Sequence, residues 1–169
     1  LHGDSLKRDD SKTEYVYKTI ENEIKKIKKE AEKPIFLWMH IPHVINGRTG
    51  YGTDIDAFDH IVGIARNKFK DTNIFIAADH GNMNGMKGKI SYGHDVYETA
   101  VNIPLIAPRI DEKRIIDNLV SNIDISTIIF ERKIPERDVV YSDSTFYAQP
   151  NRKLAIITKD YKYIYNKHS

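Results

Sequence analysis

Residues 73–81 read NIFIAADHG, and the predicted fold depends mainly on them. Five apolar residues, 74–78, run without interruption into Asp79, His80 and Gly81. A short unbroken apolar run is typical of a strand that is covered on both faces, as in a parallel sheet. We therefore expect a buried strand that delivers a carboxylate and an imidazole to its carboxyl end.

A second apolar run lies upstream at residues 35–39, IFLWM, and is followed by His40 and His43. After a glycine-rich loop, apolar residues at steps of three and four predict a helix from Thr53 or Asp54 to Phe69. The order strand, helix, strand implies a right-handed parallel crossover. Ligands gather outside the carboxyl ends of parallel strands, so we expect both histidine-bearing ends at one rim.

The remaining elements are assigned from periodicity and turn residues. We expect an amphipathic helix over 11–32, whose lysines alternate with glutamates and so indicate a solvated face. Further predictions are a strand at 101–107, short helices at 111–120 and 124–130, and β-rich pieces at 139–141, 154–158 and 161–165, the last two a hairpin with its bend at 159–160. Trp38 and the tyrosines of this hairpin are expected to pack in the core and the sheet.

The composition limits the kinds of ligand, cross-link and partner that we expect for this chain. The chain has 169 residues, a formal net charge of +2 and no cysteine, which excludes thiolate ligands and disulfides and gives no field that favours nucleic acid. No apolar run approaches the roughly 20 residues that span a bilayer, and the charged start is no signal peptide. Because the first residue is Leu1, we suspect a fragment, so the cellular compartment stays open.

Asp79 and His80 offer one oxygen and one nitrogen ligand to a metal ion. A third histidine, His94, lies in the glycine-flanked stretch SYGHD, residues 91–95. The alternative for Asp79-His80-Gly81 is a strand-ending turn in which the aspartate bonds the backbone and Gly81 has a positive φ. His40 has opposite strand parity to His43, so we expect it to be packed or hydrogen-bonded. His2, His60 and His168 are expected at the surface.

Three blocks in this order resemble the sulfatase family of the alkaline phosphatase superfamily. They are FLWMHIPH at 36–43, the helix 54–69 with NIFIAADHG at 73–81, and YGHDVYETAVNIPLI at 92–106. Weaker matches are NIDISTIIF at 122–130 and DYKYIY at 160–165. The resemblance implies an α/β fold: an alkaline phosphatase-like sheet flanked by helices over residues 1–135, followed by a small antiparallel β subdomain over 136–169.

The resemblance also implies a function, namely the metal-dependent hydrolysis of sulfate esters of small molecules or glycans. Asp79 and His80 would be metal ligands. His43 would contact the transferred group or protonate the leaving group, and His94 would stabilise the same oxyanion or be a second metal ligand. An imidazole ligand favours Mn or Zn, whereas an all-oxygen site would favour Ca, so we expect a divalent ion of one of these three kinds.

The chain departs from the family in one respect. Nothing before residue 35 resembles the family's N-terminal half, which carries the nucleophile and further metal-binding aspartates. We therefore expect a partner, the missing N-terminal half of the same enzyme, and no activity without it. The alternatives are a phosphate or phosphonate ester hydrolase, a phosphoglycerol or phosphoethanolamine transferase of the same superfamily, and a non-catalytic binding domain. A Rossmann-like nucleotide binder is disfavoured because no glycine-rich phosphate loop joins strand and helix.

Overall fold

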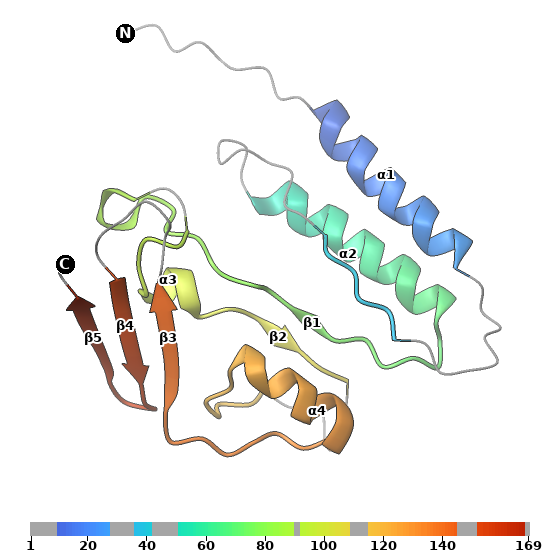
Figure 1. Cartoon of the computed structure of the whole chain (residues 1–169). Coiled ribbons are helices and arrows are strands. Elements are labelled where there is room, and N and C mark those ends of the chain that lie inside the picture. Colours follow the sequence, from blue (N-terminus) through green and yellow to red (C-terminus); the bar gives the residue numbers. More distant parts are fainter. Residues whose placement is uncertain are drawn as a thin grey trace, which may run out of the picture. The chain divides into compact units, whose positions relative to one another are not determined.

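The computed structural model describes residues 10–27, 36–41, 51–89, 92–108, 115–144 and 152–167 (Figure 1). The chain divides into two compact units between Thr72 and Asn73. The boundary that the sequence predicts after residue 135 lies inside the second unit.

The first unit is built around two helices, α1 (Asp10–Lys26) and α2 (Tyr51–Lys68). Their apolar stripes bury Tyr17 and Ile24 of α1, and Ile61 and Ala65 of α2. Lys68 at the end of α2 donates from its Nζ to the carbonyl oxygen of Ile24, at 2.6 Å, and so ties the last turns of the two helices together. Both predicted helices are confirmed over the described residues.

The run at 36–39 differs from the prediction, whereas α2 has Ile61 buried and Ile55 exposed. Residues 36–41 form no strand, and Phe36 and Trp38 are exposed. The prediction of a strand covered on both faces is therefore wrong over 36–39. An apolar run becomes a strand only where a neighbouring chain completes its hydrogen bonds, and the described residues supply no such neighbour.

The second unit begins with a two-stranded sheet of β1 (Ile76–Ala77) and β2 (Leu105–Ile106). The two strands are antiparallel, with Ile76 opposite Ile106. Between them lie the 3-10 turn η1 (Met86–Gly88) and the short helix α3 (Glu98–Val101). The predicted strands 74–78 and 101–107 thus form only in part, and every strand pair within the described ranges is antiparallel.

After β2, the chain forms the 3-10 turn η2 (Asn122–Asp124) and helix α4 (Ile125–Glu131). Helix α4 confirms the helix predicted at 124–130, whereas residues 115–120 are not helical, against the prediction for 111–120. The Asp124 side chain accepts a hydrogen bond from the Ser121 backbone N–H at 2.9 Å, and Arg137 binds both carboxylate oxygens at 2.8 and 2.9 Å. The buried carboxylate of Asp124 and the more exposed guanidinium of Arg137 together fix the segment that leads from α4 to the next strand.

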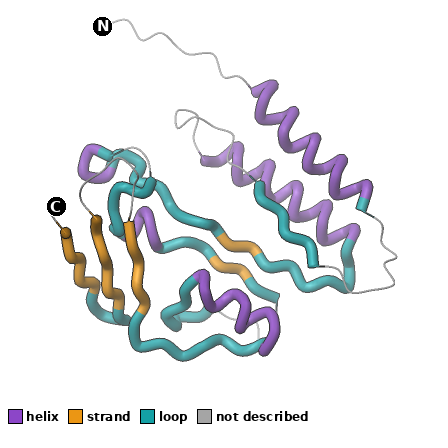
Figure 2. The backbone as a smooth tube through the Cα atoms, in the orientation of Figure 1, coloured by secondary structure: helices purple, strands orange, loops and turns teal. Residues whose placement is uncertain are grey.

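A three-stranded antiparallel sheet ends the chain. Its strands are β3 (Val140–Ser144), β4 (Arg152–Ile157) and β5 (Lys162–Lys167), in that spatial order. The hairpin of β4 and β5 confirms the prediction, and the Thr158 N–H bonds the Tyr161 carbonyl across its bend at 2.8 Å. Figure 2 shows the strands, helices and loops of both units.

The two faces of this sheet have different surroundings. Ser142, Ala155 and Ile164 are aligned in register on the inner, more buried face. Tyr141, Ile156 and Tyr163 are aligned on the outer face and are exposed. The expectation that the hairpin tyrosines pack in the core is therefore wrong for Tyr161, Tyr163 and Tyr165. Strand alternation fixed which side chains share a face, but it did not say which face would be covered.

The described residues thus form a small α/β protein with two antiparallel sheets and four α-helices. None of the helices in the described ranges combines the length and the apolar character needed to cross a membrane.

Candidate metal-binding site

Asp79, His80 and Gly81 follow β1 and lie beside α3. The Gly81 N–H donates to the Ala100 carbonyl at 2.8 Å, and the next N–H, of Asn82, donates to the Thr99 carbonyl at 2.9 Å. A Cβ on Gly81 would lie 2.1 Å from the Thr99 carbonyl oxygen. The glycine is therefore required by the close approach of α3, and not by a positive φ, since its φ lies outside that region.

The side chains of Asp79 and His80 face each other. Oδ2 of Asp79 lies 3.5 Å from Nε2 of His80, and Oδ1 accepts a hydrogen bond from the His80 backbone N–H at 2.9 Å. Both side chains reach solvent, with 73% of the aspartate and 41% of the histidine exposed. The local bond of Oδ1 is the one expected of a strand-ending turn, and it leaves Oδ2 directed at the imidazole.

The orientation of the imidazole is defined by two further contacts. Nδ1 of His80 lies 2.8 Å from the Gly81 carbonyl oxygen. A carbonyl oxygen only accepts, so the ring nitrogen that faces it is the protonated one, and in the neutral form of the imidazole Nε2 then keeps its lone pair. The ring also stacks on Tyr92, with 3.9 Å between ring centroids and 23° between planes.

Two acceptor atoms that face each other repel unless a proton or a cation lies between them. Two ligands of one tetrahedral ion, each about 2.0–2.1 Å from it, are about 3.4 Å apart. The observed separation of Oδ2 and Nε2 is 3.5 Å. The donated Nδ1–H is also the arrangement that fixes the tautomer in most metal-bound histidines. The pair therefore fits a divalent cation as two of its ligands.

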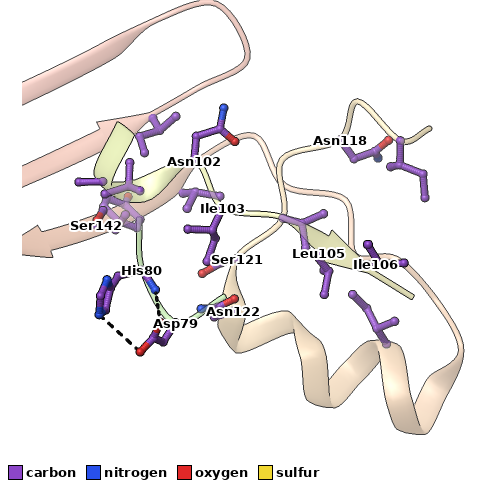
Figure 3. A pocket seen from close by; sticks show the side chains of 18 of the residues that line it. Asp79, His80, Asn102, Ile103, Leu105, Ile106, Asn118, Ser121, Asn122 and Ser142 are labelled. Carbon is purple, nitrogen blue, oxygen red and sulfur yellow. Dashed lines mark hydrogen bonds and ion pairs between the residues drawn. The ribbon is translucent and has the colours of Figure 1, made fainter. Parts of the chain in front are cut away.

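A pocket of about 840 Å³ contains this pair in its wall. That volume lies within the range of small-molecule sites, about 300–1,000 Å³. Figure 3 shows Asp79 and His80 with Ser121 and Asn122 near one part of the pocket, while Leu105 and Ile106 of β2 line another part. A polar pair thus lies beside an apolar wall.

Asn122 is a contact of this site that the sequence did not indicate. Its Nδ2 donates to the carbonyl oxygen of Ala78 at 3.2 Å, one residue before Asp79. The two residues are 44 positions apart in the sequence, so local pattern carries no signal of the contact.

Tyr92, Gly93 and Asp95, which belong to one loop, also line the pocket. Asp95 is buried and binds two lysines, Lys89 at 2.7 Å and Lys153 of β4. Burial acts to raise the pKa of Asp95, but the hydrogen bonds from Lys153 and Lys89 outweigh it, so the pKa lies below its ordinary value. The carboxylate is therefore charged at neutral pH and holds this loop against the three-stranded sheet.

The structure brings together only some of the predicted site residues. Asp79 and His80 are in contact and line the pocket. His94 lies between two residues of the wall, Gly93 and Asp95, but is not itself part of the wall. His43 lies outside the described residues. Its role and that of His94 therefore stay predictions.

His2 and His168 lie outside the described residues, so their expected surface positions stay predictions. His60 is exposed on α2, as predicted, at 3.9 Å from Glu21. His40 is exposed and stacked on Trp38 at 6.4 Å, whereas we expected it to be packed or hydrogen-bonded. In the part of the chain that the structure describes, no three or more His, Cys, Asp or Glu side chains are placed to hold one metal ion.

Comparisons with known proteins add nothing to this geometry. No family model, no curated protein and no solved structure matches the chain.

Proposed function

We propose that this chain is part of a metal-dependent hydrolase of sulfate esters, and that Asp79 and His80 bind its divalent cation. The observation that carries the proposal is the pair of ligand atoms, Oδ2 and Nε2, at 3.5 Å from each other in a pocket wall. The sequence blocks that resemble the sulfatase family supply the choice of reaction. The resemblance places the same two residues at the metal.

The donor set bears on the identity of the ion. One carboxylate oxygen and one imidazole nitrogen suit Mn²⁺ or Zn²⁺, whereas Ca²⁺ takes oxygen ligands almost entirely. Two protein ligands bind a divalent ion weakly in comparison with three or four. We therefore expect this chain to bind Mn²⁺ or Zn²⁺ detectably, and the remaining ligands to come from water, from residues outside the described ranges, or from the N-terminal half that the resemblance implies.

A bound divalent cation would supply Lewis-acid stabilisation of charge that develops on the ester oxygens. The chain's own residues would prepare the site for it. The Gly81 carbonyl holds the proton of His80 on Nδ1, which keeps Nε2 available. The Asp79 carboxylate offsets part of the positive charge. His43 and His94 would act on the transferred group, His43 as the proton donor to the leaving group.

A titration of the 169-residue chain with Mn²⁺, followed by electron paramagnetic resonance at about pH 8, tests the proposal. Free imidazole is mostly neutral there, so protonation does not compete with the metal. We expect one ion per chain and a rise in melting temperature as the ion concentration exceeds its dissociation constant. Asp79→Asn and His80→Ala should each weaken binding, and His43→Ala should leave it unchanged.

Two control variants remove the same chemical groups elsewhere. His60→Ala removes an exposed imidazole of α2, and Asp160→Asn removes an exposed carboxylate at the bend between β4 and β5. Both should bind Mn²⁺ like the unchanged chain. If Mn²⁺, Zn²⁺ and Ca²⁺ all fail to bind, or if Asp79→Asn and His80→Ala bind as well as the controls, the proposal is wrong and a non-catalytic domain is favoured.

A further inference from the structure

Tyr92 covers one face of the His80 imidazole. The two rings are stacked with 3.9 Å between centroids. The ring edge is held separately, because Nδ1 donates to the Gly81 carbonyl at 2.8 Å. A face contact and an edge contact together leave the imidazole little freedom to rotate, so Nε2 stays directed at Asp79.

The loop that carries Tyr92 is held by one pair of facing residues in the three-stranded sheet, which we call the rung. Ser144 of β3 and Lys153 of β4 are directly opposite each other in the register. The Ser144 hydroxyl donates to the Gly93 carbonyl at 2.8 Å, and the Lys153 ammonium binds the Asp95 carboxylate. The same rung therefore holds the residues on both sides of His94.

The Asp95 end of this connection is buried. Its side chain is only 2% exposed, and a buried carboxylate is tolerated only where cations and hydrogen-bond donors satisfy it. Lys153 and Lys89 provide the cations, and the Val96 N–H donates to the other oxygen at 3.2 Å. Because Asp95 cannot leave these partners without a large penalty, the position of the loop is fixed relative to the sheet.

We propose that Tyr92 is a positioning residue for the His80 imidazole, and that the rung of Ser144 and Lys153 holds Tyr92 in place. This inference rests on the proposed function, since it concerns the imidazole assigned to the metal. Under this proposal, the C-terminal sheet helps to position a ligand of the metal site. Strands β3 and β4, which belong to the subdomain predicted over 136–169, thus position a ligand that lies far upstream in the sequence.

The test compares Tyr92→Ala with Tyr92→Phe, because phenylalanine keeps the stacked ring and alanine removes it. Nitrogen-15 NMR of the histidine side chains, with His80→Gln to identify the His80 signals, reports the tautomer in the metal-free chain. We expect the Nδ1–H tautomer to dominate in the unchanged chain and in Tyr92→Phe, and both tautomers to appear in Tyr92→Ala. Mn²⁺ affinity should fall roughly two- to tenfold in Tyr92→Ala alone, the effect of one lost aromatic pair.

Lys153→Met tests the rung, because it keeps the alkyl chain and removes the ammonium. It should mix the His80 tautomers in the same direction as Tyr92→Ala. Ser144→Ala, which disturbs no charge, should give a smaller change of the same kind and serves where Lys153→Met does not fold. Lys159→Met at the exposed bend is the matched control and should leave the His80 signals unchanged.

The inference is overturned if Tyr92→Ala keeps the tautomer and affinity of the unchanged chain, or if Tyr92→Phe is as damaging as Tyr92→Ala. The role of the sheet in holding Tyr92 is overturned if Lys153→Met and Ser144→Ala both behave like the control. The tautomer is measured without metal, so a chain that binds no ion would refute the proposed function and still decide the role of Tyr92.

Discussion

The ion pairs of the two units have the same chemistry but different surroundings. In the first unit, Lys26 pairs with Glu23 one helical turn away, and both side chains are well exposed. In the second unit, Asp95 is buried and pairs with Lys153, which is 58 residues away. The helical pair joins residues that the helix already brings together, whereas the buried pair joins a loop to a sheet.

This difference decides what each pair can contribute. An exposed pair is screened by water and contributes little, while the loss of one partner of a buried pair leaves a charge without compensation. The first unit is accordingly held by the apolar stripes of its helices. The second unit depends on polar contacts between distant segments, and these contacts also position its candidate site.

Asp95→Asn should have the largest effect on stability. The substitution keeps the shape of the side chain and leaves Lys89 and Lys153 facing each other without a carboxylate. We expect the free energy of unfolding to fall by about 3–5 kcal/mol, measured by urea denaturation with a probe in the second unit. A loss below about 1 kcal/mol would mean that this pair resembles the exposed pairs of the first unit.

Gly81→Ala should have the next largest effect. The added Cβ would meet the backbone of Thr99 at 2.1 Å, so the segment with Asp79 and His80 must move away from α3. We expect a loss of about 1–3 kcal/mol in the free energy of unfolding, together with weaker Mn²⁺ binding.

Gly63→Ala is the matched control in the first unit. Gly63 lies inside α2, and a Cβ there would meet no atom within 4 Å. The substitution should stabilise the first unit by about 0.5–1 kcal/mol, because alanine favours a helix interior over glycine. If Gly81→Ala raised the free energy of unfolding as Gly63→Ala does, this result would contradict the close approach of α3 to Gly81.

Acid should weaken the second unit through Asp95 and Asp124. Burial raises the pKa of Asp95, but the hydrogen bonds from the two lysines lower it by more. The hydrogen bonds from Arg137 lower the pKa of Asp124, so the pKa values of both carboxyl groups lie below the ordinary 3.8. The unfolded chain therefore binds more protons as the pH falls from about 5 through the folded pKa values, and the free energy of unfolding decreases over that window. Above it, the contribution of both carboxylates is fully present.

Urea denaturation at a series of pH values checks this dependence. In a variant with both Asp95→Asn and Asp124→Asn, the slope of the free energy of unfolding against pH should be reduced over the same window. An unchanged slope would show that other carboxylates cause the loss of stability in acid.

Glu23→Gln should have the smallest effect. It removes an exposed partner at i,i+3 on α1, so we expect a change of about 0.5 kcal/mol or less in the free energy of unfolding of the first unit. Thermal denaturation at low and high salt measures it, and the small effect should shrink as salt increases. A loss as large as that of Asp95→Asn would remove the distinction between the two units.

Sequence alone determined part of the local elements. Steps of three and four residues located α1 and α2, and the alternating pattern with its bend at 159–160 located the β4 and β5 hairpin. These features depend on residues a few positions apart, so they can be read along the chain. The pairing of Asp79 with His80 belongs to the same class, because the two residues are adjacent.

The tertiary structure decided the contacts that give these elements their role. The approach of α3 that requires Gly81, the stacking of Tyr92 on His80, and the rung of Ser144 and Lys153 that holds Gly93 and Asp95 were not predicted. The two contacts of that rung, from Ser144 to Gly93 and from Lys153 to Asp95, join residues 51 and 58 positions apart. No periodicity links positions so distant, because what brings them together is the free energy of the whole folded unit and not the preference of any one segment.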